Sequence, residues 1–386
     1  MHHFWFDAHL DLAYLAARGR DMDAWPDDVT GPDLPAAVTL PSLSNTGPRA
    51  AGACHVGLGL ATIFVEPDGS DPRVAYRRGD AHTAHLAGLV QLEIYRSWFA
   101  SGRAGTWGNT PATTGTPANA GTTRDGRAPI RLALLIENAD CIREPAELAW
   151  WARQGVVAVG MAWFHQGRYA SGNGCNGAAD TGLTPDGRAL AAEVTRLNLV
   201  HDLSHLSDRA CAELLDTLPP HARVMASHSN CRSLMGDPAN QRHLTDATIR
   251  AIAQRGGVMG RTLYSKFLTP GQLTPADGRA SLIDTLAHVE HICQLTGSRA
   301  HVGLGSDMDG GFSAARLPAG IDMPGDLHRL ADTLAAAPFG WPDADIAAFA
   351  SGSFCRLFRL ADPPTGPPCF GSLVGSDFPA GEDLIP

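Results

Sequence analysis

Short apolar segments recur along the chain and predict β-strands. Most of these segments are rich in Val, Ile, Leu and Ala, the first is rich in aromatic residues, and polar or glycine-containing stretches bound them. Strands buried in a parallel sheet have this pattern, a nearly continuous hydrophobic run instead of a strict alternation. The eight predicted strands are residues 2–9, 54–64, 131–138, 156–165, 199–205, 223–229, 257–264 and 301–307.

Longer segments between these runs show the period of an amphipathic α-helix. In the first of them, Leu86, Val90, Ile94 and Trp98 follow one another at intervals of four residues, which predicts one apolar stripe facing the core. The predicted helices are residues 82–100, 187–197, 207–217, 245–255, 281–296 and 343–360.

The alternation of strands and helices predicts an α/β fold, a (β/α)8 TIM-type barrel with loop insertions. We expect one catalytic domain over residues 1–386, with a C-terminal tail at 361–386. Residues 101–126 are a low-complexity stretch of Gly, Thr, Pro and Asn, which predicts a loop. Because this loop leads from a helix into the third strand, it belongs on the barrel face opposite the usual active site.

The first predicted strand carries two polar side chains in an apolar setting. The stretch FDAHLDLAYL, residues 6–15, contains His9 and Asp11, which are two residues apart and share one face of a strand. Burying an imidazole and a carboxylate costs free energy unless both find partners. Two interpretations are open here, a His–Asp hydrogen bond within a core or the beginning of a metal site.

Polar residues also end four other predicted strands, namely Glu137, His205, His228 and Asp307. Each has a structural alternative: Glu137 could cap a helix near Pro145, the histidines could bond to backbone carbonyls, and Asp307 could be a turn residue. The C-terminal ends of barrel strands meet at one face, however. Three imidazoles and three carboxylates there are too many for one tetrahedral ion. They suit two divalent ions bridged by a carboxylate and a water.

Composition and charge narrow the class of protein. Of 386 residues, 44% are hydrophobic and 18% charged, so a large core is expected, and the formal net charge is −10. This charge argues against nucleic acid or an anionic membrane as a partner. The sequence has no apolar stretch long enough to span a bilayer and no basic start followed by an apolar run. We therefore expect a cytoplasmic protein.

Several longer motifs occur in order between about residue 6 and residue 360. They are DAHLDL, IENAD, GLTPDGRALAAEVTRLNLVHDLSHLSD, SHSNCRSL, RHLTDATIRAI, VGLGSDMDGG and GSFCRLFRL. In these motifs the chain resembles the renal (membrane) dipeptidase family, peptidase family M19, among the amidohydrolase-type barrels. The resemblance covers nearly the whole chain, and its long central motif is the most specific.

The resemblance implies a binuclear zinc site. Two Zn²⁺ ions would be bridged by Glu137 and by a water or hydroxide. His9 and Asp11 would complete one ion's ligands, and His205 and His228 those of the other. Many proteins of the wider superfamily bridge with a carboxylated lysine instead. The only lysine of this chain, Lys266, follows the seventh predicted strand and is in the wrong place for that role.

The resemblance also implies roles around the metals. Asp307 would take the proton of the nucleophile and pass it to the leaving amine. Arg242, in RHLTD, would bind the substrate carboxylate, with Tyr264 as a second candidate. The residue that contacts the scissile carbonyl in the family matches Trp163. His165 lies two positions on, on the same face of the predicted strand, and either residue could make that contact.

The activity that the resemblance implies is a zinc-dependent dipeptidase that cleaves L-L and L-D dipeptides with a metal-bridged hydroxide. The alternative is a related amidohydrolase for N-acyl D-amino acids or other small carboxylated amides and lactones, and a more remote one is a non-catalytic metal-binding barrel. Two departures bear on specificity: the interval from His228 to Arg242 is longer than in the family pattern, and Ser353 replaces the usual asparagine. A homodimer is the implied assembly.

Overall fold

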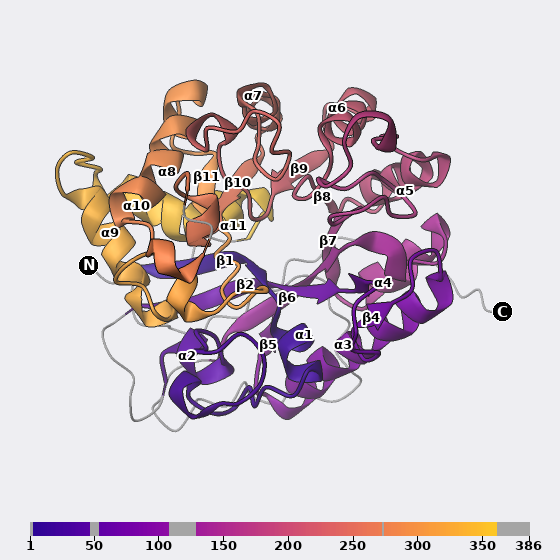
Figure 1. Ribbon diagram of the computed structural model, residues 1–386, viewed down its shortest axis with the longest axis horizontal. Helices are drawn as coiled ribbons and strands as arrows, with labels where there is room; N and C mark the ends of the chain where they lie inside the picture. The colour runs from indigo at the N-terminus through magenta and orange to yellow at the C-terminus, as the bar shows by residue number, and fades with distance from the viewer. Residues whose placement is uncertain (1–2, 47–53, 108–128, 272–273, 361–386) are drawn as a thin grey trace.

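A closed parallel barrel forms the centre of the computed structural model, which describes residues 3–46, 54–107, 129–271 and 274–360 (Figure 1). Its strands follow the order β1-β2-β6-β7-β8-β9-β10-β11, and β11 pairs with β1 to close the ring. The strands are β1 (Phe4–Leu10), β2 (His55–Phe64), β6 (Arg131–Glu137), β7 (Val156–Gly160), β8 (Val200–Asp202), β9 (Arg223–Ala226), β10 (Val258–Arg261) and β11 (Val302–Leu304). The predicted barrel fold is confirmed. Seven predicted strands contain one of these strands in full, and the first, residues 2–9, misses only the last residue of β1, Leu10.

Three short strands lie outside the barrel. β3 (Glu66–Pro67) and β4 (Ala75–Tyr76) pair with each other just after β2. β5 (Gly105–Thr106) pairs with the first residues of β6. The predicted 101–126 loop therefore opens beside the beginning of β6, at the barrel end away from the strand C-termini. Residues 108–126 of that loop, and the predicted tail at 361–386, lie outside the described residues.

Helices surround the barrel on its outer side (Figure 1). Several of them begin with an N-capping side chain: the Ser207 hydroxyl accepts the Ala210 N–H, and the Thr245 hydroxyl accepts the Thr248 N–H. Among the described residues, no helix is both long and apolar enough to cross a membrane. The helices are α1 (Leu12–Ala17), α2 (Leu40–Ser44), α3 (Ala81–Ser101), α4 (Leu148–Arg153), α5 (Pro185–Arg196), α6 (Asp208–Thr217), α7 (Asp246–Gln254), α8 (Leu282–Thr296), α9 (His328–Ala335), α10 (Asp343–Ala347) and α11 (Ser353–Leu357).

Two helix predictions need correction. The segment 343–360 is not one α-helix, because a π-helical turn at Ala348–Gly352 separates α10 from α11. On α3 the apolar stripe is wrong: Leu86 and Val90 are 47% and 41% exposed. A spacing of four residues advances about 400° around a helix, so the stripe rotates by about 40° at each step and leaves the buried face. Small residues bring α3 close to the core instead, and a Cβ at Gly88 would lie 2.9 Å from Cys141 Cβ.

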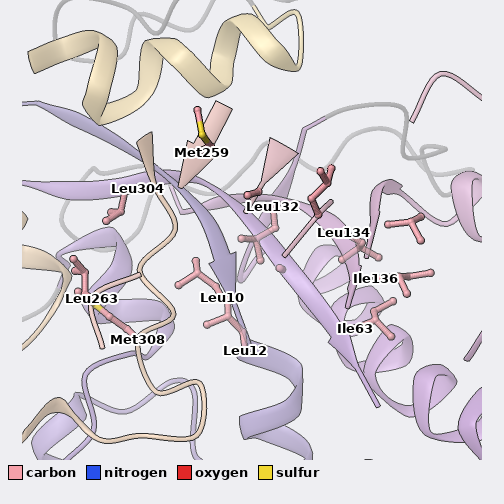
Figure 2. Close-up of a cluster of buried hydrophobic side chains, with 14 of the residues drawn as sticks. Leu10, Leu12, Ile63, Leu132, Leu134, Ile136, Met259, Leu263, Leu304 and Met308 are labelled. Carbon is pink, nitrogen blue, oxygen red and sulfur yellow. The ribbon is translucent and has the colours of Figure 1, made fainter. Parts of the chain in front are cut away.

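The hydrophobic core has two parts, one outside and one inside the barrel. The outer part fills the space between strands and helices, and Figure 2 shows Leu132, Leu134 and Ile136 of β6 within it. The inner part joins side chains from seven different strands, which can meet only inside the ring. Its aromatic side chains include Phe6 of β1 and Phe354 of α11, stacked with 5.2 Å between ring centroids. The barrel-strand members of the inner cluster are Phe6, Ala8, Leu58, Leu60, Ala133, Leu135, Ala158, Val200, Met225 and Val258.

Candidate metal centre

Imidazole and carboxylate side chains gather where the barrel strands end. One lies within β1, one is the last residue of β6, and the others lie within three residues after β1, β8, β9 and β11. All are buried or nearly so. The structure thus brings together the whole set of metal-type residues that the sequence singled out: His9, Asp11, Glu137, His205, His228 and Asp307.

Glu137 is at the centre of this group, because three imidazole nitrogens face its carboxylate. Its Oε2 lies 3.3 Å from His9 Nε2, and its Oε1 lies 3.2 Å from His205 Nε2 and 3.6 Å from His228 Nε2. The Nε2 atoms of His205 and His228 are 2.8 Å apart. Each carboxylate oxygen therefore has its own imidazole neighbours, which is the arrangement expected of a group that bridges two cation positions.

Asp11 and Asp307 lie on the His9 side of Glu137. Asp11 Oδ2 and Asp307 Oδ1 are 3.7 Å and 3.9 Å from His9 Nε2. Ligand-type atoms of His9, Asp11 and Asp307 lie within 4.8 Å of one another, as do those of His9, Glu137 and His228. The structure therefore places Asp307, to which the family resemblance assigns proton transfer, at ligand range as well.

The backbone around Asp307 is shaped for this close approach. Asp307 adopts the left-handed φ of +60°, and Asp309 one of +62°. A Cβ at Gly310 would lie only 1.9 Å from Asp307 Oδ1 and 2.9 Å from Asp11 Oδ2. Only glycine fits there, so the sequence SDMDGG permits two carboxylates to meet beside one backbone turn.

Hydrogen bonds hold the Nδ1 side of two imidazoles, those of His228 and His205. The Ser227 hydroxyl donates to Asp202 Oδ2 at 2.5 Å and lies 2.8 Å from His228 Nδ1, so it accepts the Nδ1–H of that ring. On His205, Nδ1 lies 3.0 Å from Asn173 Oδ1, an acceptor. Each Nδ1 thus carries the proton and each Nε2 presents its lone pair to the centre, as metal-ligating histidines do. The sequence analysis missed these supporting residues, although Asp202 and Ser227 stand inside the motifs HDLSH and SHSN.

Burial and mutual charge set the protonation of the cluster. Burial, with a further contribution from Arg242, lowers the pKa of His205 to about 4. Burial opposes protonation of His9 too, but the carboxylates of Glu137 and Asp11 outweigh it and raise its pKa well above the usual range. Burial raises the pKa of Asp307. The buried carboxylates thus favour a positive charge at this position. Without a bound cation, protonation of His9 supplies that charge.

The donor set fits divalent metal ions of the zinc type. Neutral imidazole Nε2 atoms and carboxylate oxygens are the ligands such ions prefer. The hydrogen-bonded Nδ1 atoms orient the rings for that purpose. Glu137 would be shared, with His9 and Asp11 on one side and His205 and His228 on the other.

Arg242 lies directly beside the cluster. It is buried, and its Nη2 donates to the backbone oxygen of His228 at 2.7 Å while its Nη1 donates to Ser229 Oγ at 3.1 Å. Its guanidinium lies over the ring of Phe267, with 5.2 Å to the centroid. Its charge is close enough to Asp307 to oppose, without overcoming, the rise that burial causes in the pKa of that carboxyl. The longer interval after His228 therefore does not keep this arginine away from the site.

The expectation that Trp163 and His165 share a strand face is wrong. β7 ends at Gly160, and both residues lie in the loop that follows. Trp163 packs near the cluster, with its ring centroid 6.2 Å from that of His205. The His165 ring instead lies edge-on to the ring of Phe164, with 4.9 Å between the two centroids. Of the two, Trp163 is the one that the fold brings to the site.

Tyr264 lies farther along the same wall as Arg242. It follows β10 and stacks on Phe312 with 4.3 Å between centroids and an interplanar angle of 3°. Its ring also contacts Phe267 at 4.8 Å, the aromatic residue beneath Arg242. Tyr264 therefore supports the surroundings of Arg242 through Phe267.

Comparison with known proteins identifies the relatives of this chain. A family model described as membrane dipeptidase (peptidase family M19) matches residues 2–363. An uncharacterized protein in the pqqA 5′ region of Klebsiella pneumoniae is 34% identical over 206 residues, 51% of this chain and 69% of that protein. The uncharacterized dipeptidase C3A11.10c of Schizosaccharomyces pombe is 32% identical over 183 residues, 47% of this chain and only 41% of that protein. Among solved structures, a metallopeptidase from Rhodobacter sphaeroides, liganded with a phosphinate mimic of L-Ala-D-Ala, has a TM-score of 0.71 at 22% identity. That match covers 92% of this chain and 98% of the other.

Proposed function

From the premise that this chain belongs to the membrane dipeptidase family, peptidase family M19, we propose that it is a metal-dependent dipeptidase. The observation that carries the proposal is the approach of three imidazole Nε2 atoms, from β1 and from the ends of β8 and β9, to the carboxylate of Glu137. Such a donor set at the C-terminal mouth of a barrel supports hydrolysis assisted by metal ions. We propose two Zn²⁺ ions, with Glu137 as the shared ligand.

Ions held there would acidify water and polarise the scissile carbonyl. Residues of the chain transfer the proton, bind the substrate carboxylate and exclude water. Asp307, buried beside the ligands, accepts the proton of the attacking water and delivers it to the leaving amine. Arg242 pairs with the carboxylate at the C-terminal end of a dipeptide through unused N–H groups. Trp163 covers the His205 side of the site and limits the access of water.

The substrates proposed are L-L and L-D dipeptides. The cationic Arg242 favours a substrate whose free carboxylate lies one residue beyond the scissile bond. We further propose that the enzyme acts in the cytoplasm as a homodimer. Size-exclusion chromatography with light scattering tests the assembly, and fractionation of cells tests the location.

The test of the function is hydrolysis of a panel of L-L dipeptides together with L-Ala-D-Ala, measured as the release of free amino acids. The metal-free protein, prepared with a chelator, should be inactive, and Zn²⁺ should restore cleavage. Metal analysis of the active protein should give two ions per chain. If zinc-loaded protein cleaves no dipeptide but hydrolyses N-acyl amino acids or lactones, the dipeptidase proposal fails and the alternative hydrolase takes its place.

A further inference from the structure

Asp33 lies in a loop that is fastened to the barrel mouth. This loop follows α1, and it is tied to the turn after β11 by the buried carboxylate of Asp309. Asp309 Oδ2 accepts the backbone N–H groups of Ala37 and Val38 at 2.8 Å and 2.9 Å. It also pairs with the guanidinium of Arg20, which in turn donates to the backbone oxygen of Asp33 at 3.3 Å. Asp33 is thereby held close to the end of β11, where the cluster lies.

The side chain of Asp33 has an unused acceptor. Its Oδ2 is buried and has no hydrogen-bond partner, while the side chain as a whole is 17% exposed. Burial raises the pKa of this carboxyl and outweighs the charges of Arg18 and Arg20, which lower it, while the charge of Asp11 adds a smaller increase. Its ion-pair neighbour, Arg18 Nη1, lies 3.9 Å away, too far for a hydrogen bond.

The conformation of Asp33 also calls for an explanation. Its φ of +57° is uncommon for a residue with a side chain. A buried carboxylate oxygen without a donor costs free energy unless a bound group supplies one. An unusual backbone conformation and an unsatisfied buried acceptor, in a loop tied to the turn that follows β11, point to a ligand with a cationic donor.

We propose that Asp33 binds the α-ammonium group of the substrate, an inference that rests on the proposed dipeptidase function. A dipeptide carries a cation at one end and an anion at the other, roughly 3.3–3.6 Å of chain per residue. Arg242, in the segment after β9, takes the anionic end, and Asp33, in the loop after α1, takes the cationic end. Together they select a free amino terminus and a length of two residues, so an N-acyl amino acid lacks one of its two anchors.

The test compares two substrates that differ only in the amine, L-Ala-L-Ala and N-propionyl-L-alanine. The variant Asp33→Asn keeps the size of the side chain, and asparagine tolerates a positive φ. It should lower kcat/KM for the dipeptide by roughly ten- to a hundred-fold, mainly through KM, the range of a charge-assisted hydrogen bond. Its kcat/KM for N-propionyl-L-alanine should stay at the wild-type value. The matched control is Asp23→Asn, the same change of charge in the same segment on a side chain that is 59% exposed and paired with Arg103.

The outcomes separate the inference from the function on which it rests. If zinc-loaded wild-type protein cleaves no dipeptide, the proposed function is at fault. If the wild type cleaves L-Ala-L-Ala and Asp33→Asn retains the same preference over N-propionyl-L-alanine, the inference about Asp33 is overturned. A second variant, Arg18→Gln, addresses a purely structural ion pair: it should keep the preference for the dipeptide. Equal loss of that preference in Arg18→Gln and Asp33→Asn would also overturn the inference.

Discussion

Arg242 allows the sharpest test of substrate binding, through the variant Arg242→Lys. The arginine has five N–H donors, and the structure commits one on Nη2 to the His228 backbone and one on Nη1 to Ser229. Its Nε–H is buried without a partner. Three donors therefore remain, enough for a two-bond pair with a substrate carboxylate. Lysine keeps the charge but offers a single nitrogen, so at most one of those bonds survives.

The expected loss follows from that count. One charge-assisted hydrogen bond contributes about 1.5–3 kcal/mol, which corresponds to a fall in kcat/KM of roughly 10- to 150-fold. The loss should appear in KM more than in kcat, because the carboxylate is remote from the bond that breaks. An amidated dipeptide, L-Ala-L-Ala-NH2, lacks the charged partner, so the same variant should slow its cleavage only about two- to threefold.

The assay is a cycle of two enzymes and two substrates, with zinc-loaded protein and release of alanine as the readout. A melting temperature within a few degrees of the wild type shows that the shared contacts to His228 and Ser229 are kept. The reasoning is refuted if Arg242→Lys loses activity by the same factor on the free and the amidated dipeptide. Arg242 would then act only by holding the end of β9.

Three further predictions concern the metals and the fold. Glu137→Gln should reduce the metal bound per chain by at least half and abolish dipeptide cleavage, because one of its two acceptor oxygens becomes a donor; metal analysis that still finds the wild-type content would contradict a bridging role. Ser227→Ala should weaken Zn²⁺ binding about 10- to 100-fold, measured by competition with a chelator, because His228 loses the partner that fixes its tautomer; unchanged affinity would speak against that role. His288 accepts the Cys231 N–H at Nδ1 and donates from Nε2 to the Leu268 oxygen, and burial lowers its pKa to about 4. Its folded pKa lies below the usual 6.5, so the unfolded state binds the proton more readily and stability falls as pH drops from 6.5 towards 4. The expected loss is up to about 3 kcal/mol. Denaturant unfolding at both pH values should show a smaller loss in His288→Gln, and an equal loss in both proteins would rule this histidine out as the cause.

The barrel was predictable because its strands are buried on both sides. Such strands read as apolar runs whatever their neighbours, and the rule that their C-terminal ends share one face places the polar residues that follow them. This rule therefore predicts that Glu137 and His228 lie close together, although they come from different strands. The hydrogen bonds around them, such as the one from Ser227 to Asp202, could not be predicted, because the spacing of apolar residues carries no information on such distances.

The residues that were misplaced depend on where strands stop. The sequence from Val156 remains largely apolar up to His165, but β7 ends at Gly160. The loop that follows pairs with itself instead, through an antiparallel bridge between Gln166 and Ser171. That pairing decides which side of the site receives Trp163. Asp33 offered no signal at all, since its loop is held in place through Ala37 and Val38, which donate to Asp309 more than 270 positions along the chain.

Closure of the barrel also determines at which point of its synthesis the chain can form an active site. His9 stands in the first barrel strand and Asp307 follows the last, and the two meet only because Asp7 of β1 pairs with Leu304 of β11. A chain still being synthesised holds the amino-terminal half of the centre without its closing edge. Peptide-bond cleavage therefore waits until β11 and Asp307 have left the ribosome, and no amino-terminal fragment that stops before β11 can carry it out.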